Sequence, residues 1–195
     1  MKIFTFSGDY IKDKIGGAEY QLDLLEKGFV ELGHEVFHVH AQPIAQRDYP
    51  FKEEANGVTV YHVQANSRIQ NIFYTPRLIS FLKDYVAREA DIIYTREFHQ
   101  HFILSKFKNV YNIPVVRTLA SDDHTMRWYN SKYFNIDYKS LFPRVLSDYT
   151  MGDLSKLITQ TNSQKEYLLK NFGIDSLVIP NGMEIIEDNF SKSGK

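Results

Sequence analysis

The sequence predicts an α/β domain in which helices cover both faces of a mostly parallel sheet. Three observations indicate this fold class. Short apolar runs of strand length alternate along the chain with stretches of helical period. Turn and capping residues such as Asn-Gly and Leu-Gly separate many of these runs. The chain has 195 residues and is 43% hydrophobic, which is enough to bury a core of useful size.

The first predicted strand covers residues 3–6, and the helix after it begins near Ala18. The apolar positions of this helix recur in steps of four and three, and Gly33 follows as a C-cap. One helical stripe therefore contains Ala18, Leu22, Leu25, Phe29 and Leu32. Strands are expected next at 35–39 and 58–63, the second of them directly after the Asn56-Gly57 turn signal.

The second half of the chain continues the alternation. Thr75 and Pro76 are suited to be the N-cap and first residue of a helix. The buried face of that helix is expected to contain Leu78, Leu82 and Tyr85. A capping-box pattern at 163–166 opens a helix that ends at Phe172-Gly173. The remaining predicted strands are 91–94, 113–116, 157–161 and 177–179, and the remaining helices are 102–110 and 143–154.

Composition excludes several classes of function. The formal net charge of −1 gives no global electrostatic case for binding nucleic acid. The chain has no cysteine, so a disulfide scaffold, a thiolate zinc site and a cysteine nucleophile are excluded, and a reducing compartment is favoured. The first residues do not read as a signal peptide, and no apolar run reaches membrane-spanning length. We therefore expect a cytoplasmic protein.

Candidate site residues follow the predicted strands, because ligands of parallel α/β sheets bind beyond the carboxyl ends of the strands. Charged and imidazole side chains in these loops could orient hydroxyl groups or carry out acid–base chemistry. The alternative is that solvated loops are polar in any protein. The candidates for such a cleft are Asp9, Arg96, Glu97, His99, Asp122, Asp123 and His124.

Gly16 and Gly17 stand where the first of these loops becomes a helix. A helix N-terminus exposes unpaired N–H groups, and glycines would let an anion touch the backbone. The alternative is a turn that requires positive φ. The spacing does not fit the dinucleotide fingerprint, and no Gly-Lys-Ser/Thr of a phosphate-binding P-loop follows.

Two further features have alternative interpretations. His38 and His40 are two residues apart, as are His99 and His101, but no third ligand stands at a recognisable spacing. We expect no metal site, and His38 and His40 could simply pack.

Residues 127–144 interleave aromatic and basic side chains, which suits sugar stacking or a lipid surface. Without a clean amphipathic period, they read better as a connector whose rings cover the core. No Gly-x-Ser-x-Gly elbow or Ser-His-Asp motif indicates a hydrolase.

Three stretches together resemble the N-terminal half of a GT-B fold retaining glycosyltransferase, specifically the large family 4. They are GGAEYQLDLLEKGFVELGHEVFHVH at 16–40, LITQTNSQKEYLLKNFGI at 157–174 and LVIPNGMEIIEDNF at 177–190. They occur in the order that the family shows. The resemblance implies one Rossmann-like doubly wound domain at 1–181, and a linker or tail at 182–195 that leads toward a donor domain absent from this sequence.

The resemblance also implies a reaction. A sugar would move from a nucleotide-sugar donor to a sugar or lipid-linked acceptor with retained configuration, and no cofactor or metal would be needed. This half would hold the acceptor, with a peripheral contact at the inner face of the membrane as a further expectation. Gly16 and Gly17 would approach the donor's diphosphate or sugar, while a second domain or separate chain would bind the donor. The sequence implies that this chain alone is inactive.

The chain departs from the family pattern in ways that limit this transfer of roles. Ala120 stands where many members carry a histidine, so no catalytic residue is assigned. The family's glutamate motif and its Lys/Arg phosphate ligands have no counterpart here. The alternative function is a non-catalytic binding module, or a subunit that pairs with a separate donor-binding chain.

Overall fold

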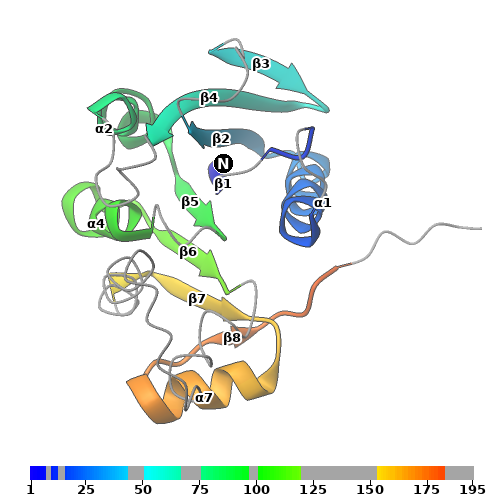
Figure 1. Cartoon of the computed structure of the whole chain (residues 1–195), viewed down its shortest axis with the longest axis vertical. Helices are drawn as coiled ribbons and strands as arrows, with labels where there is room; N and C mark the ends of the chain where they lie inside the picture. The colour runs from blue at the N-terminus through cyan, green and yellow to red at the C-terminus, as the bar shows by residue number, and fades with distance from the viewer. Residues whose placement is uncertain are drawn as a thin grey trace, which may run out of the picture.

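The computed structural model describes residues 1–7, 10–12, 16–43, 51–66, 76–96, 101–119 and 153–182. In this part of the chain, eight strands form one sheet in the order β3-β4-β2-β1-β5-β6-β7-β8 (Figure 1). All neighbouring strands run parallel except β3 and β4. The predicted α/β fold with a mostly parallel sheet is confirmed.

The element bounds follow the predicted alternation. The strands are β1 Lys2–Ser7, β2 Glu35–Pro43, β3 Lys52–Ala55, β4 Val58–Asn66, β5 Ile92–Thr95, β6 Val115–Thr118, β7 Lys156–Thr159 and β8 Leu177–Val178. The helices are α1 Gly17–Glu31, α2 Pro76–Phe81, the π-helix η1 Leu82–Val86, α3 Ala87–Glu89, α4 His101–Tyr111 and α7 Asn162–Phe172.

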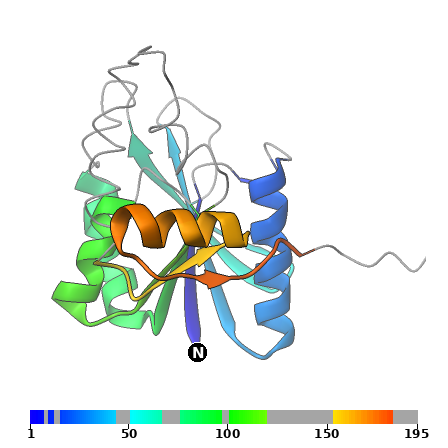
Figure 2. The ribbon, with the colours of Figure 1, turned by 90° about the horizontal axis from the view of Figure 1, so that it is seen from below.

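Helices flank the sheet on both sides (Figures 1 and 2). α1 lies on one side, and α2 and α4 lie on the other. β1 shows how the strands divide their side chains, because successive residues of a strand point to opposite faces. Phe4 and Phe6 join the large apolar core that also contains residues of α2 and α4. Thr5 and Ser7 therefore face the α1 side of the sheet.

β3 is a strand that the sequence pattern did not predict. It pairs antiparallel with β4 through a tight turn at Asn56 and Gly57, which have φ of +54° and +79°. Its sequence KEEA has no apolar periodicity, because it is an edge strand held by pairing with β4 rather than by burial.

The predicted burial of two residues, Leu32 and Tyr85, is wrong. Leu32 is 74% exposed, because α1 ends at Glu31 and Leu32 serves as its C-cap. Tyr85 is 41% exposed, whereas Val86 is fully buried. The π-helical turn of η1 uses a longer hydrogen-bond spacing than an α-helix, so the inward face moves on by one residue. Leu78 and Leu82 are buried as predicted.

The N-cap of α7 is Thr161 rather than Ser163. Thr161 Oγ1 accepts a hydrogen bond from the Gln164 backbone N–H at 3.2 Å. The Gln164 side chain reaches back and accepts from the Gln160 N–H at 2.7 Å, so a reciprocal cap forms two residues earlier than expected. Gly33 and Gly173 end α1 and α7 with φ of +80° and +68°, as helix-terminating glycines do.

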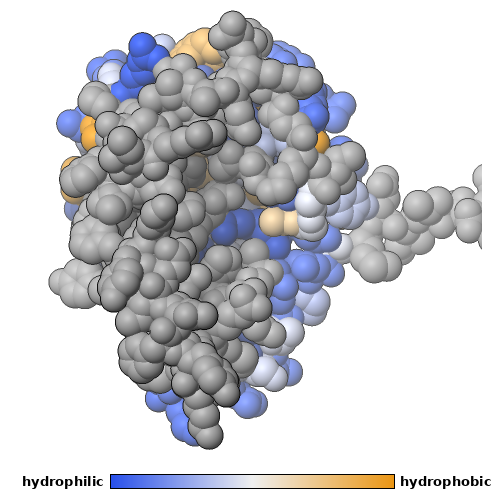
Figure 3. Space-filling view, in the orientation of Figure 1, coloured by the Kyte–Doolittle hydropathy of each residue, from blue (hydrophilic) through white to orange (hydrophobic). Residues whose placement is uncertain are grey.

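Most of the predicted helix at 143–154 and of the tail at 182–195 lies outside the described residues. The domain boundary at 181 therefore stays a prediction. Within the described part of the chain, no helix is long and apolar enough to cross a membrane. The described residues visible on the face in Figure 3 are mainly hydrophilic.

Candidate functional site

The N-terminus of α1 lies at the carboxyl edge of the sheet. Gly16 is the N-cap residue, with extended backbone angles φ −111° and ψ 168°, and Gly17 is the first helical residue. Neither glycine has positive φ, so the turn interpretation is wrong for both. Gly16 is the N-cap residue and has no side chain that could accept a hydrogen bond from the first turn of α1. Unpaired N–H groups at a helix N-terminus can bind an anion.

The two glycines differ in their surroundings. A Cβ atom added at Gly16 would collide with the carboxylate of Glu19, which lies over the Gly16 backbone. A Cβ atom added at Gly17 would meet nothing within 4 Å. Gly16 therefore accommodates a side chain of its own helix, and the open space for a ligand lies at Gly17.

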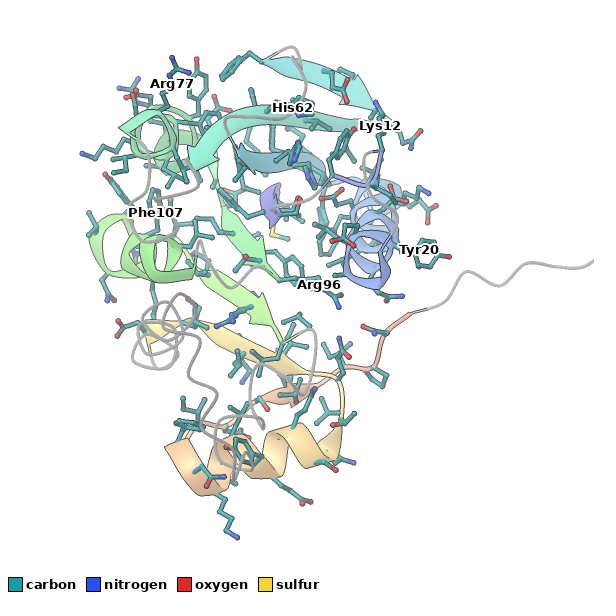
Figure 4. All side chains as sticks on the ribbon, in the orientation of Figure 1. Lys12, Tyr20, His62, Arg77, Arg96 and Phe107 are labelled. Carbon is teal, nitrogen blue, oxygen red and sulfur yellow. The ribbon has the colours of Figure 1, made fainter. Side chains whose placement is uncertain are left out.

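Arg96 brings a positive charge to the same edge. It follows β5 and extends toward α1 in Figure 4, and its Nη2 donates to Asn181 Oδ1 at 3.4 Å. Its Nε is buried, with no hydrogen-bond partner in the described part of the chain. Gln21 of α1 donates to the carbonyl of Gly182 at 2.7 Å. α1, the end of β5 and residues 181–182 thus meet at this edge.

The other predicted site residues all lie outside the described residues, and their roles stay predictions. They are Asp9, Glu97, His99, Asp122, Asp123 and His124, together with Ala120 and the aromatic stretch at 127–144.

A buried polar chain beside this edge was missed in the sequence. Thr5 donates to Glu26 Oε1, and Glu26 Oε1 also bonds His38 Nδ1 at 2.6 Å. On its other side, His38 Nε2 lies 3.0 Å from Ser7 Oγ, at the end of β1. The structure thus joins a carboxylate, an imidazole and a serine that no motif along the chain reveals. The detectable signal was that Glu26 lies one turn after Leu22, on the inward side of α1.

Two further imidazoles, His40 and His62, lie next to this series of hydrogen bonds. His40 Nδ1 and His62 Nδ1 are 3.0 Å apart, and the ring of Tyr10 packs within 5.6 Å of His38, His40 and His62. Burial lowers the pKa of His62, although the nearby Glu53 carboxylate opposes the shift. Tyr10 also donates to Glu53 at 2.8 Å. These contacts attach the loop after β1 to β2, β3 and β4.

His38, His40 and His62 are therefore buried in the interior. Packing rather than metal binding was the preferred interpretation of His38 and His40. Within the described residues, no group of three or more His, Cys, Asp or Glu side chains is placed to hold a metal ion.

The comparison with protein families decides the identity of the domain. The sequence profile of Glycosyltransferase Family 4 matches residues 15–185. The chain belongs to glycosyltransferase family 4. The match covers both stretches that form the described site, the start of α1 and the segment after β8. No curated protein sequence matches this family 4 domain significantly.

Solved structures confirm the fold of this family 4 domain. It superposes on sucrose-phosphate synthase from Thermosynechococcus elongatus with a TM-score of 0.71 and 16% identity, over 94% of this chain and 48% of that one. A shorter structure of the same synthase gives a TM-score of 0.62 and 15% identity, over 94% and 91%. At this identity the likeness shows the fold alone. The domain spans about half the length of the longer synthase chain.

Proposed function

We propose that this family 4 domain is the acceptor-binding half of an enzyme that transfers a sugar from a nucleotide-sugar donor with retained anomeric configuration. The observation that carries the proposal is the space at Gly17 in the first turn of α1, with Arg96 after β5 at the same edge, where parallel α/β sheets bind ligands. The family match and the length relative to the synthase support a missing donor-binding half.

The proposed roles follow from charge. A leaving nucleoside diphosphate carries negative charge that the transition state must stabilise. The N–H groups of α1 at Gly17 would face that charge, and the Arg96 guanidinium would orient an acceptor oxygen. The partial positive charge of a single helix terminus stabilises the charge of a leaving diphosphate only weakly. The donor-binding half would supply the remaining positive groups, either in the same polypeptide or as a separate chain.

The test compares this domain alone with the domain joined to its donor-binding partner polypeptide. Each sample is incubated with a panel of nucleotide sugars and acceptors, and binding is followed by calorimetry. We expect no transfer and at most weak donor binding by the domain alone, and transfer by the complete protein. NMR of the new glycosidic bond should show the donor's anomeric configuration.

Three outcomes would contradict the proposal. Micromolar donor affinity of the isolated domain would place the donor site in this half. A product of inverted configuration would refute retention. A complete protein that binds a ligand and transfers nothing would favour the alternative of a non-catalytic binding module.

A further inference from the structure

A separate cavity lies on the flank of α1. It has a volume of about 100 Å³ and lies between α1, the loop residues 10–12 and the β3–β4 hairpin. Figure 4 labels Lys12 in this region, between the hairpin and α1. Its lining includes neither Gly17 nor Arg96, so it is distinct from the candidate transferase site. Apolar walls come from Leu22, Val58 and Val60.

The Glu26 carboxylate is a buried acidic group in the lining of this cavity. Its side chain is only 8% exposed. Both hydrogen bonds that it makes within the described part of the chain, to Thr5 and His38, end on Oε1. A carboxylate can accept about four hydrogen bonds on its two oxygens. Oε2 is therefore left to accept a hydrogen bond from a molecule in the cavity.

The charges around the cavity favour a cation. Lys12 is bonded to Glu53 at 2.8 Å, and Lys27 to Asp23 at 2.8 Å, so each lining lysine already faces a carboxylate. The lining carboxylates beyond these pairs are Glu19 and Glu26. A positively charged donor would gain a charge-assisted hydrogen bond at Glu26, whereas an anion would be repelled.

We propose that this cavity binds a small primary ammonium compound. The ammonium group donates to Glu26 Oε2, and a short apolar chain lies against Leu22, Val58 and Val60. The volume suits a ligand of roughly five non-hydrogen atoms. The site does not depend on the proposed transferase function, because its described lining contains neither Gly17 nor Arg96.

The cavity is also connected to the carboxyl edge of the sheet. Glu26 bonds His38 Nδ1, and His38 Nε2 lies 3.0 Å from Ser7 Oγ at the end of β1. A new donor on Glu26 weakens its attraction for the His38 proton, because the carboxylate charge is then shared among three donors. Ligand binding therefore changes the imidazole nitrogens of His38, which gives a direct spectroscopic signature.

The experiment titrates the chain with butylammonium, butan-1-ol and propionate, which have similar sizes and different charge. Amide chemical shifts locate binding, and the imidazole ¹⁵N shifts of His38 report contact with Glu26. We expect saturable butylammonium binding with a Kd of about 1 mM. Butan-1-ol should bind at least tenfold more weakly, and propionate should not saturate. Equal affinity for all three, or no saturation by butylammonium, would overturn the proposal.

Variants separate the site from general effects of charge. Glu26→Gln should reduce butylammonium affinity at least tenfold and abolish the ligand-induced His38 shift. Glu31→Gln removes an exposed carboxylate from the same helix and should change neither. Ala55→Leu reduces the cavity from the hairpin side while Glu26 itself is retained, and should abolish binding. It provides the test if Glu26→Gln does not fold. Unchanged binding by Ala55→Leu would place the ligand elsewhere.

Discussion

Replacing His38 by valine should destabilise the domain strongly, because it removes a partner from a buried carboxylate. Glu26 would keep only Thr5 among its described partners. Breaking a buried pair from one side costs about 3–5 kcal/mol. Valine suits the strand position of His38, so backbone propensity should add little to this cost.

Replacing Glu26 by leucine tests the same contact from the other side. Thr5 Oγ1 and His38 Nδ1 would lose their shared acceptor, and each unsatisfied buried donor costs about 1–3 kcal/mol. The double variant Glu26→Leu with His38→Val leaves neither charge nor imidazole behind. Its cost should be about 2–5 kcal/mol, for the acceptor that Thr5 loses and the bond that Ser7 loses, and each of these losses already occurs in one of the single variants. The coupling free energy between the two sites should therefore exceed about 3 kcal/mol.

Urea unfolding followed by circular dichroism measures this cycle at pH 7. All four proteins should unfold with similar denaturant slopes, which makes the free energies comparable. A double variant that is folded while either single variant is unfolded would also support the prediction. If the two single effects add to within about 0.5 kcal/mol, the buried Glu26–His38 contact does not exist as described.

Three further predictions concern other parts of the domain. Gly17→Ala should leave stability unchanged or raise it by up to about 1 kcal/mol, because the position is helical with open space around it. In the proposed transferase, the same change should slow sugar transfer at least tenfold, because a Cβ atom would obstruct a ligand at this backbone. Thr161→Ala should cost about 1 kcal/mol through loss of the α7 cap. His62 has a folded pKa below its ordinary 6.5, so it favours the folded state above pH 6.5 and this contribution is lost as pH falls. A His62→Gln variant should therefore show a flatter loss of stability between pH 7 and 5, measured by urea midpoints.

Each of these three predictions would be contradicted by a specific result. Normal transfer rates in Gly17→Ala would show that no ligand approaches that backbone. A Thr161→Ala variant as stable as the parent chain would place the α7 cap at Ser163, as the sequence pattern suggested. An unchanged pH slope in His62→Gln would mean that His62 is not desolvated in the folded state.

The sequence predicted the elements well where local physics decides them. α1 was recognised from its apolar period and from Gly33, because both signals lie within the helix itself. β3 was missed because its residues are polar and only pairing with β4 stabilises it. The N-cap of α7 was misplaced by two residues, because Ser163 and Thr161 both begin plausible capping patterns. Tyr85 was misassigned because a π-helical turn changes the period that the prediction assumed.

The candidate site divides in the same way. Gly17 and Arg96 were predicted as candidates because the alternation of strands and helices places their loops at one edge of the sheet, and their roles stay predictions. The sequence could not distinguish the surroundings of Gly16 from those of Gly17, because the difference depends on where the Glu19 side chain lies.

The fold class, the edge of the sheet proposed to carry the site and the resemblance to glycosyltransferase family 4 could be predicted from the sequence alone. These depend on periodicity and on motifs whose residues are neighbours along the chain. The series of buried hydrogen bonds from Glu26 through His38 to Ser7, and the cavity beside it, became visible only in the folded structure. Strand alternation shows that Thr5 and Ser7 share a face of β1, but not which helix covers it. Contacts between α1, β1 and β2 form only when the sheet is assembled, and no local pattern records them.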